Sequence, residues 1–252
     1  MTLAILSALP QEQAGLHPLL SGTRVQTHAG REFVCGDYRG LPVVLALSRI
    51  GKVAAATTAT ALIERFGVQR IVFSGVAGGL GAGVRVGDLV VAAECLQHDM
   101  DASPLFPRHE VPLYGRSRFA CDPALAALLL AGAQALQGDL AGRFDAQVRE
   151  RYRLDGLQVH QGLLLSGDRF VGTEAESTAL RRELPEALAV EMEAAAVAQV
   201  CHDYGLPFAA LRSVSDRADD QAHVDFACFL EEVAGHCSTQ VLRHLLDALS
   251  RS

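Results

Sequence analysis

Apolar and polar positions follow two alternating periods along this 252-residue chain. Short apolar runs typical of buried strands are followed by segments whose apolar residues recur at helical spacing. This alternation predicts a single α/β domain with a mixed or parallel central sheet covered by helices. The expected strands are 3–9, 32–38, 41–48, 71–74, 88–93, 157–166, 187–192 and 208–214; the expected helices are 12–20, 51–66, 123–136, 174–183, 226–249 and one opening at Glu193.

Two stretches interrupt this pattern. Residues 98–119 contain three prolines, one of them Pro112, together with Phe106 and Tyr114, which indicates a long ordered loop. Such loops in compact domains are more often functional or interfacial than idle. Residues 138–156 are charged and irregular, and we expect a surface excursion there.

Composition narrows the class of protein. Half of the residues are hydrophobic and a fifth are charged, which indicates a globular chain. The net charge of −7 argues against a nucleic-acid surface, and the absence of Trp argues against a stacking platform for single strands. The six cysteines form no C-x-x-C pair, so we expect reduced core thiols in a cytoplasmic protein. We interpret residues 1–10 as a buried strand and not as a signal peptide, and we expect no membrane span.

Carboxylates stand where three of the expected strands stop. Glu12 follows the first apolar run, Glu191 and Glu193 close the run at 187–192, and Asp216 follows the run at 208–214. In open α/β sheets, ligands bind outside the carboxyl ends of strands. Acids gathered there predict acid–base chemistry on a sugar-like or polyhydroxy substrate.

Each acid also has a structural interpretation. The Glu193 carboxylate would be stabilised by the N-terminus of the helix it opens, and Asp216 could cap a loop. Glu191 ends an apolar strand, where a buried charge is costly without a role or a partner.

Three further motifs have both a structural and a functional interpretation. The glycine-rich stretch 74–83 is compatible with a ligand loop or with a plain turn, because it matches neither a Walker loop nor a clean G-x-G-x-x-G. Lys52 after Gly51 is interpreted as a surface lysine. The segment 98–101, His-Asp-Met-Asp, is interpreted as a hydrogen-bonding loop, since no further metal ligands are suitably spaced nearby.

Six segments of the chain belong together: SALPQE at 7–12, SRIGKVAA at 48–55, GVAGGL at 75–80, SGDRF at 166–170, AVEMEA at 189–194 and RSVSD at 212–216. Taken in this order they resemble the nucleoside phosphorylase/nucleosidase superfamily, and specifically the bacterial 5′-methylthioadenosine/S-adenosylhomocysteine nucleosidases. The resemblance implies a three-layer α/β/α domain with a central mixed sheet, a homodimer, and hydrolysis of the adenine–ribose bond of 5′-thio-substituted adenosines without a cofactor.

The resemblance also implies roles for individual residues. Asp216 would protonate adenine N7, and Glu12 would activate the attacking water with help from Arg212. Glu193 would grip the ribose hydroxyls, with the Met192 backbone against the ribose. Phe170 would stack on adenine, and Val171 would read the base edge. The remaining residues expected around the substrate are Ile50 and Phe226 at the 5′ substituent, Phe106 and Pro112 from the partner subunit, and Val76, Ala77, Gly78, Glu191 and Ser215.

The chain departs from the family's pattern at three places. Val76 stands where the family commonly has Ser or Thr, and valine cannot hydrogen-bond to the water. Pro10-Gln11 replaces a more acidic pair. Arg169 beside Phe170 is unusual for a base pocket, and we expect it to point away.

Three alternative functions stay open. A phosphorylase of the same fold would use phosphate in place of water, and Arg49 keeps this alternative in play, although Glu12 would repel phosphate. The same residues could hydrolyse another adenine nucleoside such as aminodeoxyfutalosine. A nucleoside-binding protein without catalysis is less consistent with Glu12, Glu193 and Asp216 all being present.

Overall fold

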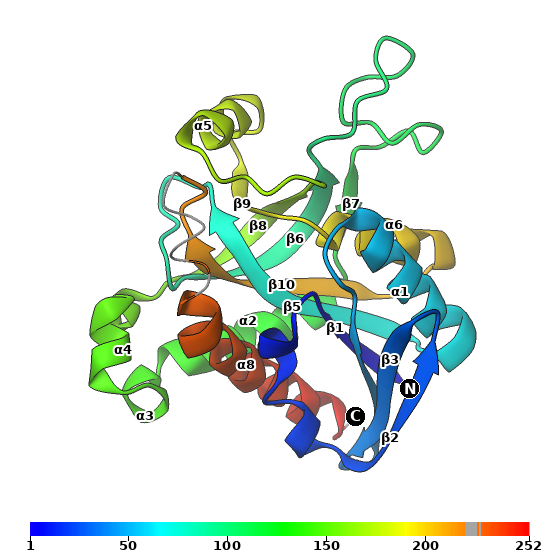
Figure 1. The fold of residues 1–252 in the computed structure, drawn as a ribbon, viewed down its shortest axis with the longest axis vertical. Helices are drawn as coiled ribbons and strands as arrows, with labels where there is room; N and C mark the ends of the chain where they lie inside the picture. Colours follow the sequence, from blue (N-terminus) through cyan, green and yellow to red (C-terminus); the bar gives the residue numbers. More distant parts are fainter. Residues whose placement is uncertain (220–225, 227, 252) are drawn as a thin grey trace.

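The computed structural model describes residues 1–219, 226 and 228–251 (Figure 1). Within these residues, ten strands form one mixed sheet, as predicted, in the order β10-β6-β8-β9-β5-β1-β4-β3-β2, with β7 paired to β6. The strands are β1 Leu3–Ser7, β2 Ser21–His28, β3 Arg31–Tyr38, β4 Leu41–Leu47, β5 Arg70–Gly79, β6 Leu89–Gln97, β7 Arg118–Ala120, β8 Val159–Ser166, β9 Ala187–Glu191 and β10 Phe208–Asp216.

The sheet closes on itself at one end. Strand β5 pairs with β1 and also with both β9 and β10, so β10, β6, β8, β9 and β5 form a ring. Asp216 at the end of β10 thereby lies opposite Gly78 of β5, and Gly78 also lies opposite Val190 of β9. The closure brings together strand ends that are about 140 residues apart in sequence.

Helices cover both faces of the sheet. Leu3 and Ile5 of β1 pack with α2 and α8 on one face, while Ala4 and Leu6 pack with α1 and α6 on the other (Figure 1). A strand buried on both faces reads as a continuous apolar run, which is why β1 was predictable. The helices are α1 Lys52–Phe66, α2 Pro123–Gln137, α3 Leu140–Arg143, α4 Ala146–Arg151, α5 Glu174–Glu183, α6 Ala194–Tyr204 and α8 Gly235–Leu249, with single turns at Pro10–Gln13, His17–Leu19 and Leu154–Gly156 and a π-helical turn at Leu230–Ala234.

The helix ends follow from local chemistry. Asp122 caps α2 by accepting the Leu125 N–H at 2.8 Å, and Pro123 occupies the first turn. Helices α1 and α6 each end at a glycine in the left-handed region, Gly67 and Gly205.

Several predicted boundaries were wrong. The expected helix 12–20 is two short 3₁₀ turns, and β2 was missed because its residues are exposed and mostly polar. Strand β5 continues through the first glycines of the stretch 74–83. The excursion 138–156 contains α3 and α4. The predicted helix 226–249 is found in its later part as Leu230–Ala234 and α8, whereas its start lies partly outside the described residues.

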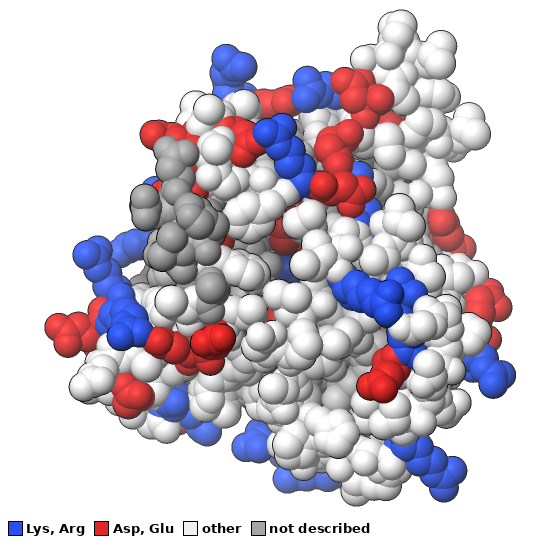
Figure 2. Space-filling model, viewed as in Figure 1, with Lys and Arg blue, Asp and Glu red and all other residues white. Residues whose placement is uncertain are grey.

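The surface is mixed in charge and hollowed on one side. Figure 2 shows a hollow near the middle of this face, with acidic atoms in its depth. No helix in the described part of the chain is long and apolar enough to cross a membrane.

Candidate active site

A pocket of about 360 Å³ lies where β1, β5, β9 and β10 end. Predicted site residues from β5, β9 and β10 and from the segments beside the strands line it. They are Glu12, Ile50, Val76, Ala77, Gly78, Phe170, Val171, Glu191, Met192, Glu193, Ser215, Asp216 and Phe226. Ala8, Leu9, Arg169 and Val190 also line it and were not predicted, although each belongs to or adjoins one of the quoted family segments.

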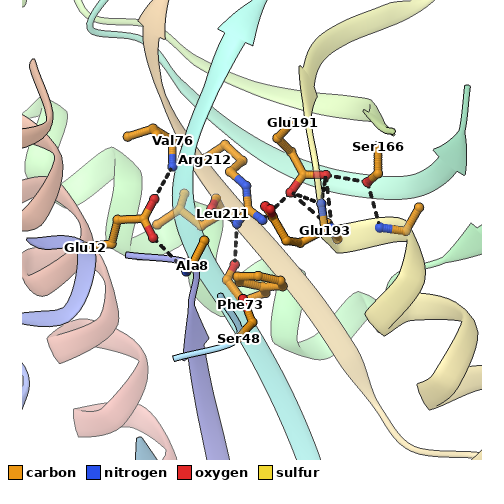
Figure 3. Close-up of polar contacts among 12 residues, drawn as sticks. Ala8, Glu12, Ser48, Phe73, Val76, Ser166, Glu191, Glu193, Leu211 and Arg212 are labelled. Atoms are coloured by element: carbon orange, nitrogen blue, oxygen red, sulfur yellow. Dashed lines mark hydrogen bonds and ion pairs between the residues drawn. The ribbon is translucent and has the colours of Figure 1, made fainter. Parts of the chain in front are cut away.

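Glu12 is held by backbone amides. Its carboxylate accepts the N–H groups of Ala8 and Leu9, both at 2.8 Å, and that of Val76 at 3.1 Å (Figure 3). The side chain is 2 % exposed. Burial raises the pKa of Glu12, against the lowering effect of these amides and of the Arg212 charge. A fixed carboxylate with a raised pKa suits the acceptance of a proton near neutral pH.

Two glycines of the stretch 74–83 make room for carboxylates. A Cβ on Gly75 would lie 2.8 Å from Oε1 of Glu12, and one on Gly78 would lie 2.9 Å from Oδ1 of Asp216. The stretch therefore makes room for protein carboxylates and also lines the pocket with Val76, Ala77 and Gly78, which fits the ligand-loop interpretation better than a plain turn.

Asp216 ends β10 and is also fixed. Oδ2 accepts the Ser215 hydroxyl at 2.7 Å, and Oδ1 accepts the Ala218 N–H at 2.8 Å. The side chain is 2 % exposed and borders the pocket. A carboxyl group held at this position can donate a proton to a bound base.

Glu191 forms the buried ion pair of the site. Its Oε2 lies 2.5 Å from Nη2 of Arg212, and its carboxylate also accepts the N–H groups of Glu193 and Ala194 at the start of α6. The Ser166 hydroxyl donates to it as well. Glu191 is thus a buried charge with a partner, which offsets the cost of placing it at the end of an apolar strand. Its carboxylate also accepts hydrogen bonds from the free N–H groups at the N-terminus of α6.

Arg212 lies beneath the pocket and does not line it. Its guanidinium contacts Glu191, the carbonyl oxygens of Phe73 and Leu211, and the face of the Phe73 ring, 4.4 Å from the ring centre. Glu12 and the Glu191–Glu193 pair lie on either side of it in Figure 3. All these contacts face the protein interior, and the expected help of Arg212 in activating the water stays a prediction.

Glu193 accepts fewer hydrogen bonds from the described residues than the neighbouring Glu191 does. It accepts the Gly51 N–H at 2.8 Å at the start of α1. Burial, followed by the charge of Glu191, raises the pKa of Glu193 to about 8. Its remaining acceptor capacity points to a ligand that donates hydrogen bonds.

The pocket has an apolar side. Phe170 and Phe226 meet edge to face with ring centres 6.2 Å apart, and Phe170 is 46 % exposed. Ile50 is 56 % exposed at the rim. Arg169 borders this side, but its guanidinium pairs with Glu176. Flat and aliphatic surfaces of this kind suit a purine ring and an apolar substituent.

Phe106 and Pro112 do not border this pocket. They belong to the loop between β6 and β7, which projects from the body of the molecule at the upper right of Figure 1. On the same loop, Leu105 and Leu113 are 84 % and 91 % exposed.

The segment 98–101 ties loops together. Asp99 accepts the Lys52 ammonium at 2.5 Å and the Asp168 N–H at 2.8 Å. This agrees with the interpretation as a hydrogen-bonding loop, whereas the interpretation of Lys52 as a surface lysine was wrong, since its side chain is only 14 % exposed. Among the residues that the structure describes, no group of three or more His, Cys, Asp or Glu could hold a metal ion.

Comparison with known proteins agrees with this geometry. The sequence profile of the phosphorylase superfamily matches residues 2–249. The chain is 36 % identical over 244 residues to a 5′-methylthioadenosine/S-adenosylhomocysteine nucleosidase of Bacillus subtilis, covering 96 % of this chain and 97 % of the relative.

Solved structures give the same result. The nucleosidase of that name from Neisseria meningitidis, in complex with methylthio-immucillin-A, superposes with a TM-score of 0.86 at 34 % identity, covering 98 % of this chain and 99 % of that one. A futalosine hydrolase of Helicobacter pylori superposes with a TM-score of 0.85 at 32 % identity, covering 98 % of both chains. By its sequence, its fold and its pocket, the chain belongs to the phosphorylase superfamily and, within it, to the 5′-methylthioadenosine/S-adenosylhomocysteine nucleosidases.

Proposed function

We propose that the protein hydrolyses the N-glycosidic bond between adenine and ribose in 5′-methylthioadenosine and S-adenosylhomocysteine. The products are adenine and the 5-thio-substituted ribose. The observation that carries the proposal is the convergence of Glu12, Glu193 and Asp216 on one pocket that also has an apolar side. Its relatives carry this activity in their names.

Asp216 acts on the leaving base. Breaking the bond leaves negative charge on adenine, and a proton delivered from the Asp216 carboxyl to N7 neutralises it. The Ser215 hydroxyl and the Ala218 amide fix the orientation of this carboxyl. Phe170 stacks on the base, and the backbone of Val171 reads its edge.

Glu12 and Glu193 act on the sugar side. Glu12 removes a proton from the attacking water, and its raised pKa favours this role. Glu193 accepts hydrogen bonds from the ribose hydroxyls, with the Met192 backbone beside them. Both carboxylates favour the positive charge that develops on the ribose in the transition state.

Arg212 is a positioning residue in this mechanism. Its charge lowers the pKa of Glu12 and that of Glu193, and its ion pair holds Glu191 at the start of α6. It acts on the substrate only through these groups.

Hydrolysis of a futalosine-type nucleoside is the second candidate. The similarity to the futalosine hydrolase of Helicobacter pylori favours it, since the TM-score is within 0.01 of the value for the Neisseria nucleosidase. Both candidates use the same three carboxylates and differ only in what lies beyond the 5′ carbon.

The working unit is proposed to be a homodimer in the cytoplasm. The exposed apolar residues of the loop that carries Phe106 and Pro112 are costly to leave in water and fit a contact that closes the 5′ end of the partner's pocket. The six cysteines form no disulfide, which is consistent with a reducing compartment.

Substitution of the two reacting carboxyls tests the mechanism. Asp216→Asn keeps the shape but cannot deliver a proton, and Glu12→Gln removes the base. Each should lower kcat for adenine release by about 10² to 10⁴ while the folded far-UV spectrum is retained. A folded variant that keeps more than about a tenth of the wild-type kcat contradicts the role given to that residue.

A further inference from the structure

A second cavity, of about 650 Å³, adjoins the proposed active site. It shares Ala8, Leu9 and Ile50 with the catalytic pocket, so the two spaces are continuous past the Ile50 side chain. If Ile50 lies at the 5′ substituent, as the proposed function has it, a long substituent leaves the catalytic pocket into this second cavity.

Two arginines line the second cavity and converge on one turn. Arg49 donates to the carbonyl oxygen of Gly30, between β2 and β3. Arg31 donates to the carbonyl oxygen of Ala29 at 3.0 Å. Figure 2 shows Lys and Arg side chains gathered to the right of the hollow, over β3 and the beginning of α1.

Neither arginine forms an ion pair in the described part of the chain, although Glu32 also lines this cavity. Burial, followed by the neighbouring Arg49 charge, lowers the pKa of Arg31. In addition, Nε of Arg31 is buried without a hydrogen-bond partner among the described residues. An anion that pairs with both guanidinium groups would lower the repulsion between these two like charges and could use the unpartnered donor.

The backbone at Arg49 supports a specific role for this side chain. Its φ of 65° lies in the left-handed region, which is sterically unfavourable for residues other than glycine. Such conformations are kept where the surrounding structure holds them, and they gather at ligand sites. A glycine would satisfy the turn at lower cost but would carry no guanidinium.

We propose that Arg31 and Arg49 form a carboxylate subsite that selects substrates whose 5′-thio substituent ends in an anion. S-adenosylhomocysteine has such a carboxylate three carbons beyond its sulfur, and 5′-methylthioadenosine has none. The subsite therefore favours S-adenosylhomocysteine, and by the same chemistry a futalosine-type nucleoside with a carboxylate in its side chain. This inference deepens the proposed function and rests on it.

The test compares two adenosine thioethers of equal length. One carries 3-carboxypropylthio at the 5′ position, and the other carries 3-carbamoylpropylthio, its neutral amide, which lacks the carboxylate. Release of adenine is measured for the wild type, Arg31→Gln and Arg49→Gln. The ratio of kcat/KM for the first substrate over the second should fall about tenfold in each variant, through KM, the order expected for one charge-assisted hydrogen bond. Arg24→Gln on β2 is the matched control for the loss of one exposed positive charge.

The outcomes separate the two proposals. An unchanged ratio in both arginine variants, or one that falls as much in Arg24→Gln, overturns the carboxylate subsite. Equal losses of kcat/KM for both substrates overturn it too, because they show that the arginines have a structural role that does not depend on the substrate carboxylate. A wild-type rate that requires inorganic phosphate assigns the arginines to phosphate and also overturns it. Failure of the wild type to release adenine from any of the thioethers rejects the proposed function itself.

Discussion

Nη2 of Arg212 lies 2.5 Å from Oε2 of Glu191 beneath the catalytic pocket, and the two side chains are 1 % and 3 % exposed. This buried pair leaves the neighbouring Glu193 without a full counter-charge of its own. The consequence is a division of roles between the two glutamates, in which Glu191 stabilises the structure and Glu193 contacts the ligand.

The Glu191→Gln variant tests this division. Loss of the carboxylate leaves the Arg212 charge buried without its partner, which should lower the free energy of unfolding by about 3 kcal/mol. Glu193→Gln is the matched control, since it removes a carboxylate two residues away that has no ion pair among the described residues. Urea unfolding of both variants near pH 7 gives the comparison, and equal losses of stability contradict the division.

Glu193 should make stability depend on pH. Its pKa is about 8 in the folded protein and near 4.5 when unfolded, so the unfolded chain gives up its proton first as the pH rises. The contribution of this group to stability is therefore complete below pH 4.5 and is lost as the pH rises through about 8. The Tm of Glu193→Gln minus that of the unliganded wild type should increase between pH 5 and pH 8 and then level off. A difference that shrinks over this range is the opposite of the expected sign.

The glycine stretch should matter for catalysis more than for folding. A Cβ at position 78 would lie 2.9 Å from the Asp216 carboxylate and 3.0 Å from Cβ of Ala218, so it would push the carboxylate out of its place. Gly78→Ala should stay folded but lose about 10²-fold in kcat/KM, since small misplacements of a reacting group have effects of that order. Gly83→Ala is the control, because a Cβ there would meet nothing within 4 Å. If the two variants have similar kcat/KM values, the small size of Gly78 is not needed to position Asp216.

Phe106 should act across the proposed dimer. Phe106→Ala is expected to raise KM about fivefold for 5′-methylthioadenosine and less for adenosine, which lacks the apolar 5′ group; burial of one aromatic side chain is worth a few kcal/mol at most. Steady-state kinetics with both substrates and sedimentation of the wild type at assay concentration provide the measurements. A fully active monomer rejects the shared pocket.

The sequence predicted the fold class and the cluster of acids because both follow from strong local signals. Strand β1 is a buried apolar run and β10 begins with one at residues 208–211, and the acids interrupt the pattern where the strands end. Strand β2 could not be found, because its exposed polar residues have no buried face to produce a period.

The finer assignments depended on contacts between distant segments. Nothing local to Arg212 indicates that it lies under the pocket against Glu191, and nothing local to Gly78 indicates that Asp216 approaches it. The meeting of β5 with both β9 and β10 creates these contacts, and the sequence pattern does not determine that closure.

The group that replaces adenine on the anomeric carbon of the ribose is the most direct test of hydrolysis. The wild type is incubated with 5′-methylthioadenosine in H₂¹⁸O, with and without inorganic phosphate, and the products are analysed by mass spectrometry. We predict adenine and a free 5-methylthioribose that carries one ¹⁸O, at a rate unaffected by phosphate. A ribose 1-phosphate product, or a reaction that stops without phosphate, would contradict the account.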